Sequence, residues 1–333
     1  MRLRKVQVDG PGLSRRRAGR GFTYLGPDGE RITDPQVIER CTALVIPPAW
    51  QQVWICPDPA GHIQAVGIDD AGRRQYLYHE LWRARRDRAK HRHVLEVAHR
   101  LPEARGRVVE HLALPRLTRE KALAVAFRLL DRGAFRIGGE AYAARHETYG
   151  LATLRKDHLR ITREGQLEFR FVAKSGQEHS LHLSDEDVLS PLGTLRRRRG
   201  GGPDLLAYRN GAGWSDITSA QINEYLKELL GPDASAKDFR TWRGTVLAAV
   251  TLARSEETAT ARQRQAAVRA AVARVSEELG NTPAVARGSY IDPNLIDAFE
   301  RGRTIPAAAR TPEEAGSYRA LSPAEEAVLD LLG

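Results

Sequence analysis

Short apolar stretches separated by turn sequences dominate the first 80 residues, a pattern typical of β-strands joined by tight connections. Glycine and aspartate recur in the turns, as in Gly26–Gly29 and Asp69–Gly72. The preceding residues 1–20 are polar and rich in arginine, which predicts a flexible basic arm. We predict a small, mostly β domain over residues 21–90, with strands that include Phe22–Leu25, Val53–Ile55, His62–Val66 and Gln75–Tyr78.

A basic helix is expected to end this domain and to connect it to the rest of the chain. From His79 onward, arginine and lysine recur through residues 83–92. Taken alone, such a stretch is more often a solvated helix face than a binding surface.

Beyond residue 100 the pattern changes mainly to helices. Thr118 is suited to cap an apolar helix that ends near Gly133. A long polar helix over residues 255–279 is expected to end at Gly280, and Thr282 is suited to cap the next helix.

One part of this helical region breaks the pattern. Residues 158–183 contain two β-hairpin signals, and Lys174 lies at or beside the tip of the second. The predicted fold class is therefore α+β. A small, mostly β N-terminal domain precedes a larger, mainly α-helical domain over residues 91–303 with a small hairpin sheet, and a C-terminal tail follows over residues 304–333.

The charge balance narrows the possible partners. The 333 residues include 52 Lys and Arg against 42 Asp and Glu, a formal net charge of +10. This excess favours a polyanionic partner, and nucleic acid before a membrane. The two cysteines, Cys41 and Cys56, imply no disulfide framework and are expected to be reduced core residues. The N-terminus lacks the apolar stretch of a secretory signal, so we expect a cytoplasmic protein.

Basic residues around a tyrosine form the candidate chemistry. The sequence contains no Gly-rich phosphate loop, no His/Cys metal cluster and no serine nucleophile motif, so neither a metal nor another cofactor is expected. Four separated segments stand out instead: Phe135-Arg136-Ile137-Gly138, Val172-Ala173-Lys174-Ser175-Gly176, Lys237-Asp238-Phe239-Arg240-Thr241-Trp242, and Asn281-Thr282-Pro283 with Gly288-Ser289-Tyr290-Ile291.

These segments resemble the catalytic domain of type IB DNA topoisomerases, in the poxvirus-like branch that occurs in bacteria. Order, spacing and local sequence agree across the four motifs, and the resemblance covers most of the chain. It extends to Glu147–Leu154, which resembles the segment after the first catalytic arginine. The resemblance implies a tyrosine recombinase/topoisomerase IB-like catalytic core over residues 91–303. It also implies an isomerase that relaxes supercoiled duplex DNA by nicking one strand, without metal or ATP.

The resemblance assigns a role to five residues. Tyr290 would be the nucleophile and would form a 3′-phosphotyrosyl bond as the 5′-hydroxyl leaves. Arg136 and Arg240 would stabilise the phosphorane, because guanidinium groups stay charged and donate in a fork. Lys174 would be the general acid for the leaving hydroxyl. Asn281 stands where much of the family has histidine; its amide can donate a hydrogen bond to a non-bridging oxygen but cannot transfer a proton.

A second set of residues is expected to bind DNA. Gln75, Tyr76 and Tyr78 resemble residues that contact bases in the major groove, and Tyr142 resembles a tyrosine that contacts DNA near the cleavage site. The prediction is a monomer that clamps duplex DNA and is associated with the nucleoid. Phosphate contacts without base information are expected from the basic helix, at Arg83, Arg85 and Arg86.

Several alternatives remain open at this point. Any single arginine, lysine or tyrosine of the set is by itself more often a surface or core residue than a catalytic one, and Asn281 is also suited to a helix cap. A tyrosine site-specific recombinase would use the same residue types, although its N-terminal domain is usually helical. A non-enzymatic basic DNA-binding protein would share the composition but would form no covalent adduct with DNA.

Overall fold

The computed structural model describes residues 1–174, 176–255, 260–310 and 318–333. The chain divides into two compact units, Met1–Lys90 and His91–Gly333. Together they contain the mixture of sheets and helices that the sequence predicts, so the α+β class is confirmed.

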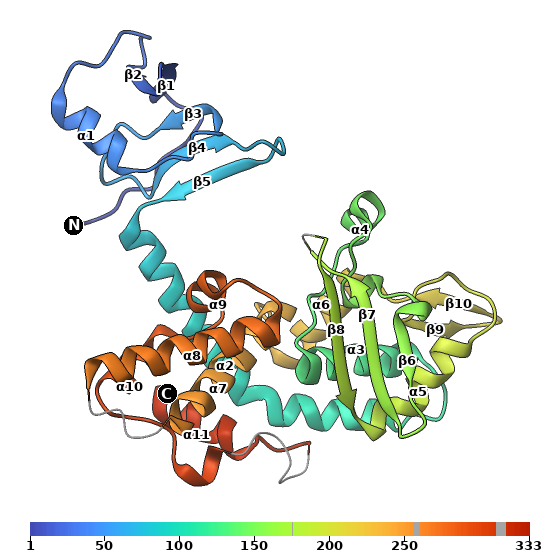
Figure 1. Ribbon diagram of the computed structural model, residues 1–333. Coiled ribbons are helices and arrows are strands. Elements are labelled where there is room, and N and C mark those ends of the chain that lie inside the picture. Colours follow the sequence, from blue (N-terminus) through green and yellow to red (C-terminus); the bar gives the residue numbers. More distant parts are fainter. Residues whose placement is uncertain (175, 256–259, 311–317) are drawn as a thin grey trace. The chain divides into compact units, whose positions relative to one another are not determined.

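A five-stranded antiparallel sheet forms the N-terminal unit, with the strand order β2-β1-β3-β4-β5 (Figure 1). One face of the sheet carries the core of this unit, in which Val53, Ile55 and Ala65 pack with Cys41 of the single short helix. Both Cys41 and Cys56 are free, buried thiols. The elements are β1 (Leu13–Ala18), β2 (Gly21–Leu25), α1 (Pro35–Ala43), β3 (Gln51–Ile55), β4 (Ile63–Ile68) and β5 (Arg74–Tyr78).

The prediction of a flexible arm is wrong for the residues that form β1. This strand pairs with β2 on one side and with β3 on the other. Leu13 at its start is buried in the core, and Arg15 donates 2.8 Å and 3.2 Å hydrogen bonds to the carbonyls of Ile46 and Trp50. The arginine-rich sequence does not look like a strand, but the guanidinium group of Arg15 satisfies backbone acceptors inside the unit.

Helix α2 (Glu80–Leu112) follows β5 and is longer than the basic stretch that predicts it. Its first three turns belong to the N-terminal unit and carry the exposed basic residues. Its later residues belong to the C-terminal unit, where Val94, Val97, Leu101 and Val108 are buried in the large core.

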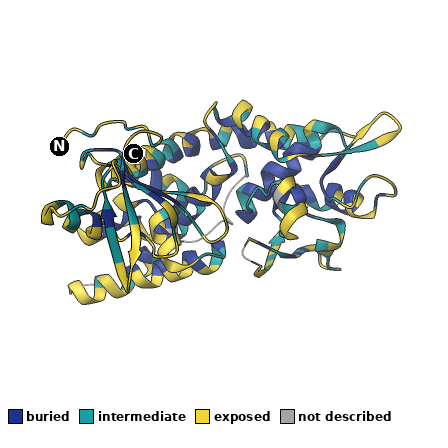
Figure 2. Ribbon diagram, turned by 90° about the horizontal axis from the view of Figure 1, so that it is seen from above, coloured by how far each residue is buried: buried dark blue, intermediate teal, exposed yellow. Residues whose placement is uncertain are grey.

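The C-terminal unit is mainly helical and includes a three-stranded sheet, β6-β7-β8, and a separate two-stranded one, β9-β10 (Figure 1). Buried positions run along the inner faces of its helices and strands (Figure 2). No helix of the described ranges combines the length and apolar character that a membrane span needs. The elements after α2 are α3 (Arg119–Gly133), α4 (Glu140–His146), β6 (Leu159–Ile161), β7 (Gln166–Val172), β8 (Glu178–Ser184), α5 (Glu186–Arg197), β9 (Ala207–Asn210), β10 (Gly213–Asp216), α6 (Ser219–Leu230), α7 (Ala236–Arg254), α8 (Ala261–Leu279), α9 (Pro283–Ser289), α10 (Pro293–Glu300), α11 (Pro323–Leu332) and the 3₁₀ turns Leu151–Thr153, Lys156–His158 and Ala307–Arg310.

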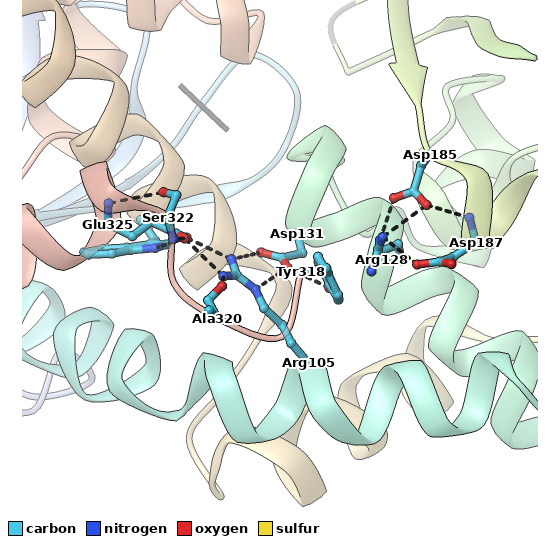
Figure 3. A network of polar contacts seen from close by, with 10 residues as sticks. Arg105, Arg128, Asp131, Asp185, Asp187, Tyr318, Ala320, Ser322 and Glu325 are labelled. Carbon is cyan, nitrogen blue, oxygen red and sulfur yellow. Dashed lines mark hydrogen bonds and ion pairs between the residues drawn. The ribbon is translucent and has the colours of Figure 1, made fainter. Parts of the chain in front are cut away.

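The prediction of a separate tail over residues 304–333 is wrong for its last part. Helix α11 buries Ala324, Val328 and Leu329 in the same core as α3 and α7. Its Glu325 forms a two-pronged ion pair with the buried Arg105 of α2, at 2.8 Å and 3.0 Å (Figure 3). Apolar burial and a buried ion pair therefore tie this end of the chain into the unit.

Candidate active site

The site is built where α3, α8 and α9 of the C-terminal unit end, and Arg240 of α7 binds the ends of the first two. Arg240 is 3% exposed. Its Nη1 donates to the carbonyl of Ala134 at 2.5 Å, and its Nη2 donates to the carbonyl of Leu279 at 2.7 Å. Those two carbonyls lie at the end of α3 and the end of α8. One guanidinium thus pairs helix-end carbonyls that have no partner inside their own helices.

Arg136 is held by the segment that follows α8, which we call the Leu279–Asn281 strap. Its Nη2 donates to the Gly280 carbonyl at 2.9 Å and to Asn281 Oδ1 at 2.7 Å. Gly280 has φ +57°, a left-handed conformation that suits glycine at a helix end. Because Arg240 also binds a carbonyl of this strap, both predicted catalytic arginines depend on the same three residues.

The motif that contains Arg136 is fixed by a close backbone approach. Gly138 has φ +77°, and a Cβ there would lie 2.9 Å from the Cα of Gly150. The neighbouring carbonyls of Arg136 and Ile137 each accept a 2.8 Å hydrogen bond, from the amides of Leu151 and Ala152. The glycine of this motif is therefore needed for the turn that positions the arginine.

Tyr290 comes directly after α9 and lies against α7. The Cζ atom of Arg240 is 5.0 Å from the centroid of the Tyr290 ring. The Thr245 hydroxyl donates to the Tyr290 carbonyl at 3.4 Å and accepts from the Asp292 amide at 3.1 Å. A Cβ on Gly244 would lie 2.6 Å from the Tyr290 carbonyl oxygen. Since Gly244 is one helical turn after Arg240, a single face of α7 carries the arginine and the seat of the tyrosine.

The electrostatics of the site are those of excess positive charge. Burial lowers the pKa of Arg240, the nearby Tyr290 opposes this shift, and the positive charge of Arg136 adds to it. Within the described ranges, neither arginine forms an ion pair with a carboxylate, and their partners include carbonyl and amide oxygens. Such a pair of cations is suited to an anion that enters from outside the protein.

The other predicted catalytic residues are placed less directly. Lys174 is exposed in the turn between β7 and β8, which is closed by a 2.8 Å hydrogen bond from the Ala173 amide to the Gln177 carbonyl. The hairpin tip predicted for Lys174 is thus present. The amide nitrogen of Asn281 donates to the Leu279 carbonyl at 3.2 Å, and its oxygen accepts from Arg136. The amide thus helps to hold the strap, and the direct hydrogen bond expected from it to a non-bridging oxygen stays a prediction.

Sequence reasoning missed three residues of the site: His179, Gly244 and Thr245. His179 lies on β8, and its Nδ1 would be 3.2 Å from a Cβ on Gly280. Burial first, and then the charges of Arg136 and Arg240, lower its pKa, while Glu278 opposes this. Gly244 and Thr245 could have been found because they closely follow the Lys237–Trp242 motif, but no spacing relates His179 to the arginines.

The predicted DNA-reading residues lie on β5, the edge strand of the N-terminal sheet. Tyr76 and Tyr78 are 40% and 38% exposed and stack with their ring centroids 6.1 Å apart. Leu77 between them packs against the core, so alternation puts both tyrosines on the opposite face. Two large exposed aromatic rings on one strand form a surface on which bases can pack.

Gln75 is engaged within its own unit. By alternation it shares the Leu77 face of β5, and its Nε2 donates to Asp69 Oδ2 at 2.8 Å. Hydrogen bonds from Arg73 lower the pKa of Asp69 to about 2, so this carboxylate accepts the hydrogen bond that Gln75 donates. Among the remaining predicted contacts, the side chain of Tyr142 lies outside what the structure describes, and the basic residues on α2 that are exposed include Arg83, Arg85 and Arg86.

Two protein families match the chain in the same order as its units. Residues 21–69 match the family described as "Bacterial DNA topoisomerase IB, N-terminal domain". Residues 79–299 match "Eukaryotic DNA topoisomerase I, catalytic core". The second match alone covers about two thirds of the 333 residues and includes every predicted catalytic position.

Named proteins are similar over different lengths. DNA topoisomerase 1B of Acanthamoeba polyphaga mimivirus is 26% identical over 295 residues, which cover 87% of this chain and 88% of the viral protein. DNA topoisomerase 1 of Daucus carota is 28% identical over 130 residues, 39% of this chain and 15% of the plant protein.

The paired N-terminal and core matches set aside the two alternatives. A site-specific recombinase would not carry the topoisomerase N-terminal domain, and a non-enzymatic binder would not be expected to keep an assembled catalytic core. The chain therefore belongs to the type IB DNA topoisomerases and has the bacterial type of N-terminal domain.

Proposed function

We propose that the chain relaxes supercoiled duplex DNA by transient nicking of one strand, without metal or ATP. The Tyr290 oxygen attacks the scissile phosphorus, the phenol proton is lost, and the bond to the 5′-oxygen breaks. The products are a 3′-phosphotyrosyl ester and a 5′-hydroxyl. After the strand rotates, the 5′-hydroxyl attacks the ester, restores the phosphodiester and releases the phenol. Since one ester replaces another in each direction, no external energy source is needed.

The observation that carries this proposal is the convergence of two arginines and a tyrosine from three separated motifs. Arg240 lies beside the Tyr290 ring, and the Leu279–Asn281 strap links Arg240 to Arg136. A phosphorane gains negative charge on its non-bridging oxygens, and two guanidinium groups that lack carboxylate partners in the described ranges can stabilise it. Their present carbonyl contacts hold them in place for that task.

Lys174 is proposed as the general acid. The departing 5′-oxygen is a poor leaving group unless it receives a proton as the bond breaks. An exposed ammonium at a hairpin tip is free to enter a groove of the duplex beside the cut phosphate. Asn281 is proposed to act mainly through Arg136, whose Nη2 donates a 2.7 Å hydrogen bond to Asn281 Oδ1.

DNA binding is proposed to use surfaces of both units of one chain. Tyr76, Tyr78 and Gln75 of β5 would contact bases, and Tyr142 would contact DNA near the cut. Arg83, Arg85 and Arg86 would neutralise phosphates without reading sequence. The proposal is that a monomer clamps the duplex, and that it acts in the cytoplasm on the DNA of the nucleoid.

The experiment is plasmid relaxation with EDTA present and ATP absent, followed by SDS. We expect relaxation, and we expect a protein–DNA adduct joined to the 3′ end of the nick. Tyr290→Phe removes the attacking oxygen and should give neither product while still binding DNA. Relaxation or adduct formation by Tyr290→Phe would contradict the proposal, as would strict dependence of the wild type on a divalent metal.

A further inference from the structure

The predicted residues use part of their hydrogen-bond donors within the protein itself. Arg136 and Arg240 already spend donors on the strap carbonyls and on Ala134. Asn281 has turned its amide onto the strap, where its oxygen binds Arg136 and its nitrogen binds Leu279. One N–H of the Asn281 amide is thus committed to the strap, so a second neutral donor near the two cations would add to the hydrogen bonds available for a phosphate.

His179 is the neighbouring side chain that has such a donor. It lies on the inward-facing row of β8, where its ring meets the Phe171 ring at 5.4 Å and 71°. Its Nδ1 and Cε1 edge lies against Gly280, since a Cβ on Gly280 would be 3.2 Å and 3.3 Å from these atoms. The ring is only half-buried, and its nitrogens have no hydrogen-bond partner within the described ranges. A polar ring that adjoins the strap of both arginines is thus available to a ligand.

The charged surroundings favour the uncharged ring. Burial is the largest cause that lowers the pKa of His179, and the charges of Arg136 and Arg240 lower it further. The nearby carboxylate of Glu278 opposes this shift. Near pH 7 the imidazole is then neutral and keeps a single N–H, so it can donate one hydrogen bond without adding a third positive charge.

We propose that His179 is a further catalytic residue, whose imidazole donates an N–H hydrogen bond to a non-bridging oxygen of the phosphate gripped by Arg136 and Arg240. The inference rests on the proposed transesterification and extends it. It gives the site a neutral donor that comes from β8, whereas Asn281, the position expected to donate, belongs to the strap after α8. Packing against Phe171 and Gly280 fixes the ring, so the bond would be ready before the phosphorane forms.

The experiment measures single-turnover cleavage of a duplex oligonucleotide that carries a cut site mapped on plasmid. His179→Leu removes both ring nitrogens and keeps an apolar side chain against Phe171. Loss of a hydrogen bond to a charged group should slow cleavage roughly 10- to 100-fold. DNA affinity, measured in the Tyr290→Phe background, should stay within about twofold. His179→Gln places an amide N–H near the position of Nε2 and should recover part of the rate.

A second measurement separates contact with phosphate from mere support of the strap. Sulfur replaces one non-bridging oxygen at a time at the cut site, and each diastereomer is cleaved by the wild type and by His179→Leu. Because sulfur is a weak acceptor, one diastereomer should slow the wild type and lose most of that effect in the variant. His182→Leu is the matched control, because His182 is on the same strand but faces outward.

The outcomes are distinct. A slower His179→Leu whose sulfur effect disappears for one diastereomer supports the proposal. Cleavage by His179→Leu at the wild-type rate overturns it, and so does slow cleavage with both sulfur effects unchanged, which would leave His179 as packing for the strap. Failure of the proposed function itself would look different, since no adduct would then form in the wild type.

Discussion

Two groups of buried arginines lie in the C-terminal unit, and they differ in what neutralises them. Arg105 is paired bidentately with both Asp131 and Glu325, and these contacts belong to one connected network (Figure 3). Although burial alone would lower it, the two carboxylates raise the pKa of Arg105 above its usual range. Arg240 binds two carbonyl oxygens and lies beside the Tyr290 side chain, without a carboxylate partner in the described ranges, and burial lowers its pKa.

The difference shows how one residue type serves two purposes. The network of Arg105 extends to Tyr318, whose hydroxyl donates to Asp131 at 2.7 Å, and to Trp242, whose Nε1 donates to Glu325 at 3.0 Å. Charge there is compensated inside the protein, so the arginine links α2 to α3 and α11 through its two carboxylate partners. Arg240 keeps its charge uncompensated by any carboxylate of the described ranges, at a cost in stability, and is thereby prepared for phosphate.

The largest expected effect comes from removal of the uncompensated arginine. Arg240→Ala should lower the single-turnover cleavage rate by ~10²–10⁴-fold, because the phosphorane loses a fixed charge. Thermal unfolding should change less than in the Arg105 variant below, since a buried charge without a carboxylate is also removed. Rates of adduct formation, with DNA affinity measured in parallel, test this. A cleavage rate close to that of the wild type would remove Arg240 from the chemistry.

Removal of the compensated arginine should affect stability instead. Arg105→Met leaves Asp131 and Glu325 buried without their partner and should lower the free energy of unfolding by about 3–5 kcal/mol. Urea denaturation measures this loss. At low temperature the folded fraction should still cleave at nearly the wild-type rate, because Arg105 is not at the phosphate. Loss of cleavage with unchanged stability would reverse the comparison.

The same pair predicts how stability depends on pH. Burial alone would raise the pKa of Asp131, but Arg105 lowers it below its ordinary value. Its contribution to stability is therefore present at neutral pH and is lost as the pH falls through its folded-state pKa. Unfolding measured from pH 7 to well below the ordinary pKa of a carboxyl group should show a smaller loss from this pair in Arg105→Met, in which Asp131 has lost the cation that lowers its pKa most.

Sequence patterns predicted the active-site motifs more fully than they predicted the arginine network. The caps at Thr118 and Thr282 and the helix end at Gly280 were readable, because helix termini have local residue preferences. No local signal tells that Arg105 pairs with Glu325, which lies 220 residues away. Arg136 was located by a local motif, the one that resembles a known family, and not by any rule for buried charge.

The arginine-rich stretch at the end of α5 makes the same point. Four consecutive arginines occupy residues 196–199, and the side chain of Arg198 among them is fully buried. Its Nη1 donates 3.0 Å hydrogen bonds to the carbonyls of Leu195 and Leu205, and its Nη2 lies 3.3 Å from Asp216. A guanidinium that satisfies backbone acceptors looks, in sequence, like any exposed arginine.

A smaller effect should follow from disturbing the tyrosine's seat. Gly244→Ala introduces a Cβ 2.6 Å from the Tyr290 carbonyl oxygen, so Tyr290 must move relative to Arg240. Misplacement of a nucleophile by a fraction of an ångström should slow cleavage roughly 10- to 100-fold. Gly288→Ala is the matched control: it lies two residues before Tyr290, and nothing lies within 4 Å of its added Cβ. Equal rates for the two variants would show that the close approach to α7 does not set the position of Tyr290.

The smallest effect is expected at Asn281, and it decides how the uncompensated arginines are held. Asn281→Ala removes an acceptor of Arg136 but leaves the Gly280 carbonyl, 2.9 Å from the same Nη2, in place. One of two anchors remains, so the cleavage rate should fall by less than about tenfold, well below the loss for either arginine. Asn281→Asp should instead resemble an arginine variant, because a carboxylate beside Arg136 would compensate its charge as Asp131 compensates Arg105. If Asn281→Ala were the slower of the two, the amide would be a phosphate ligand after all, and the contrast between carbonyl-held and carboxylate-held arginines would not explain the site.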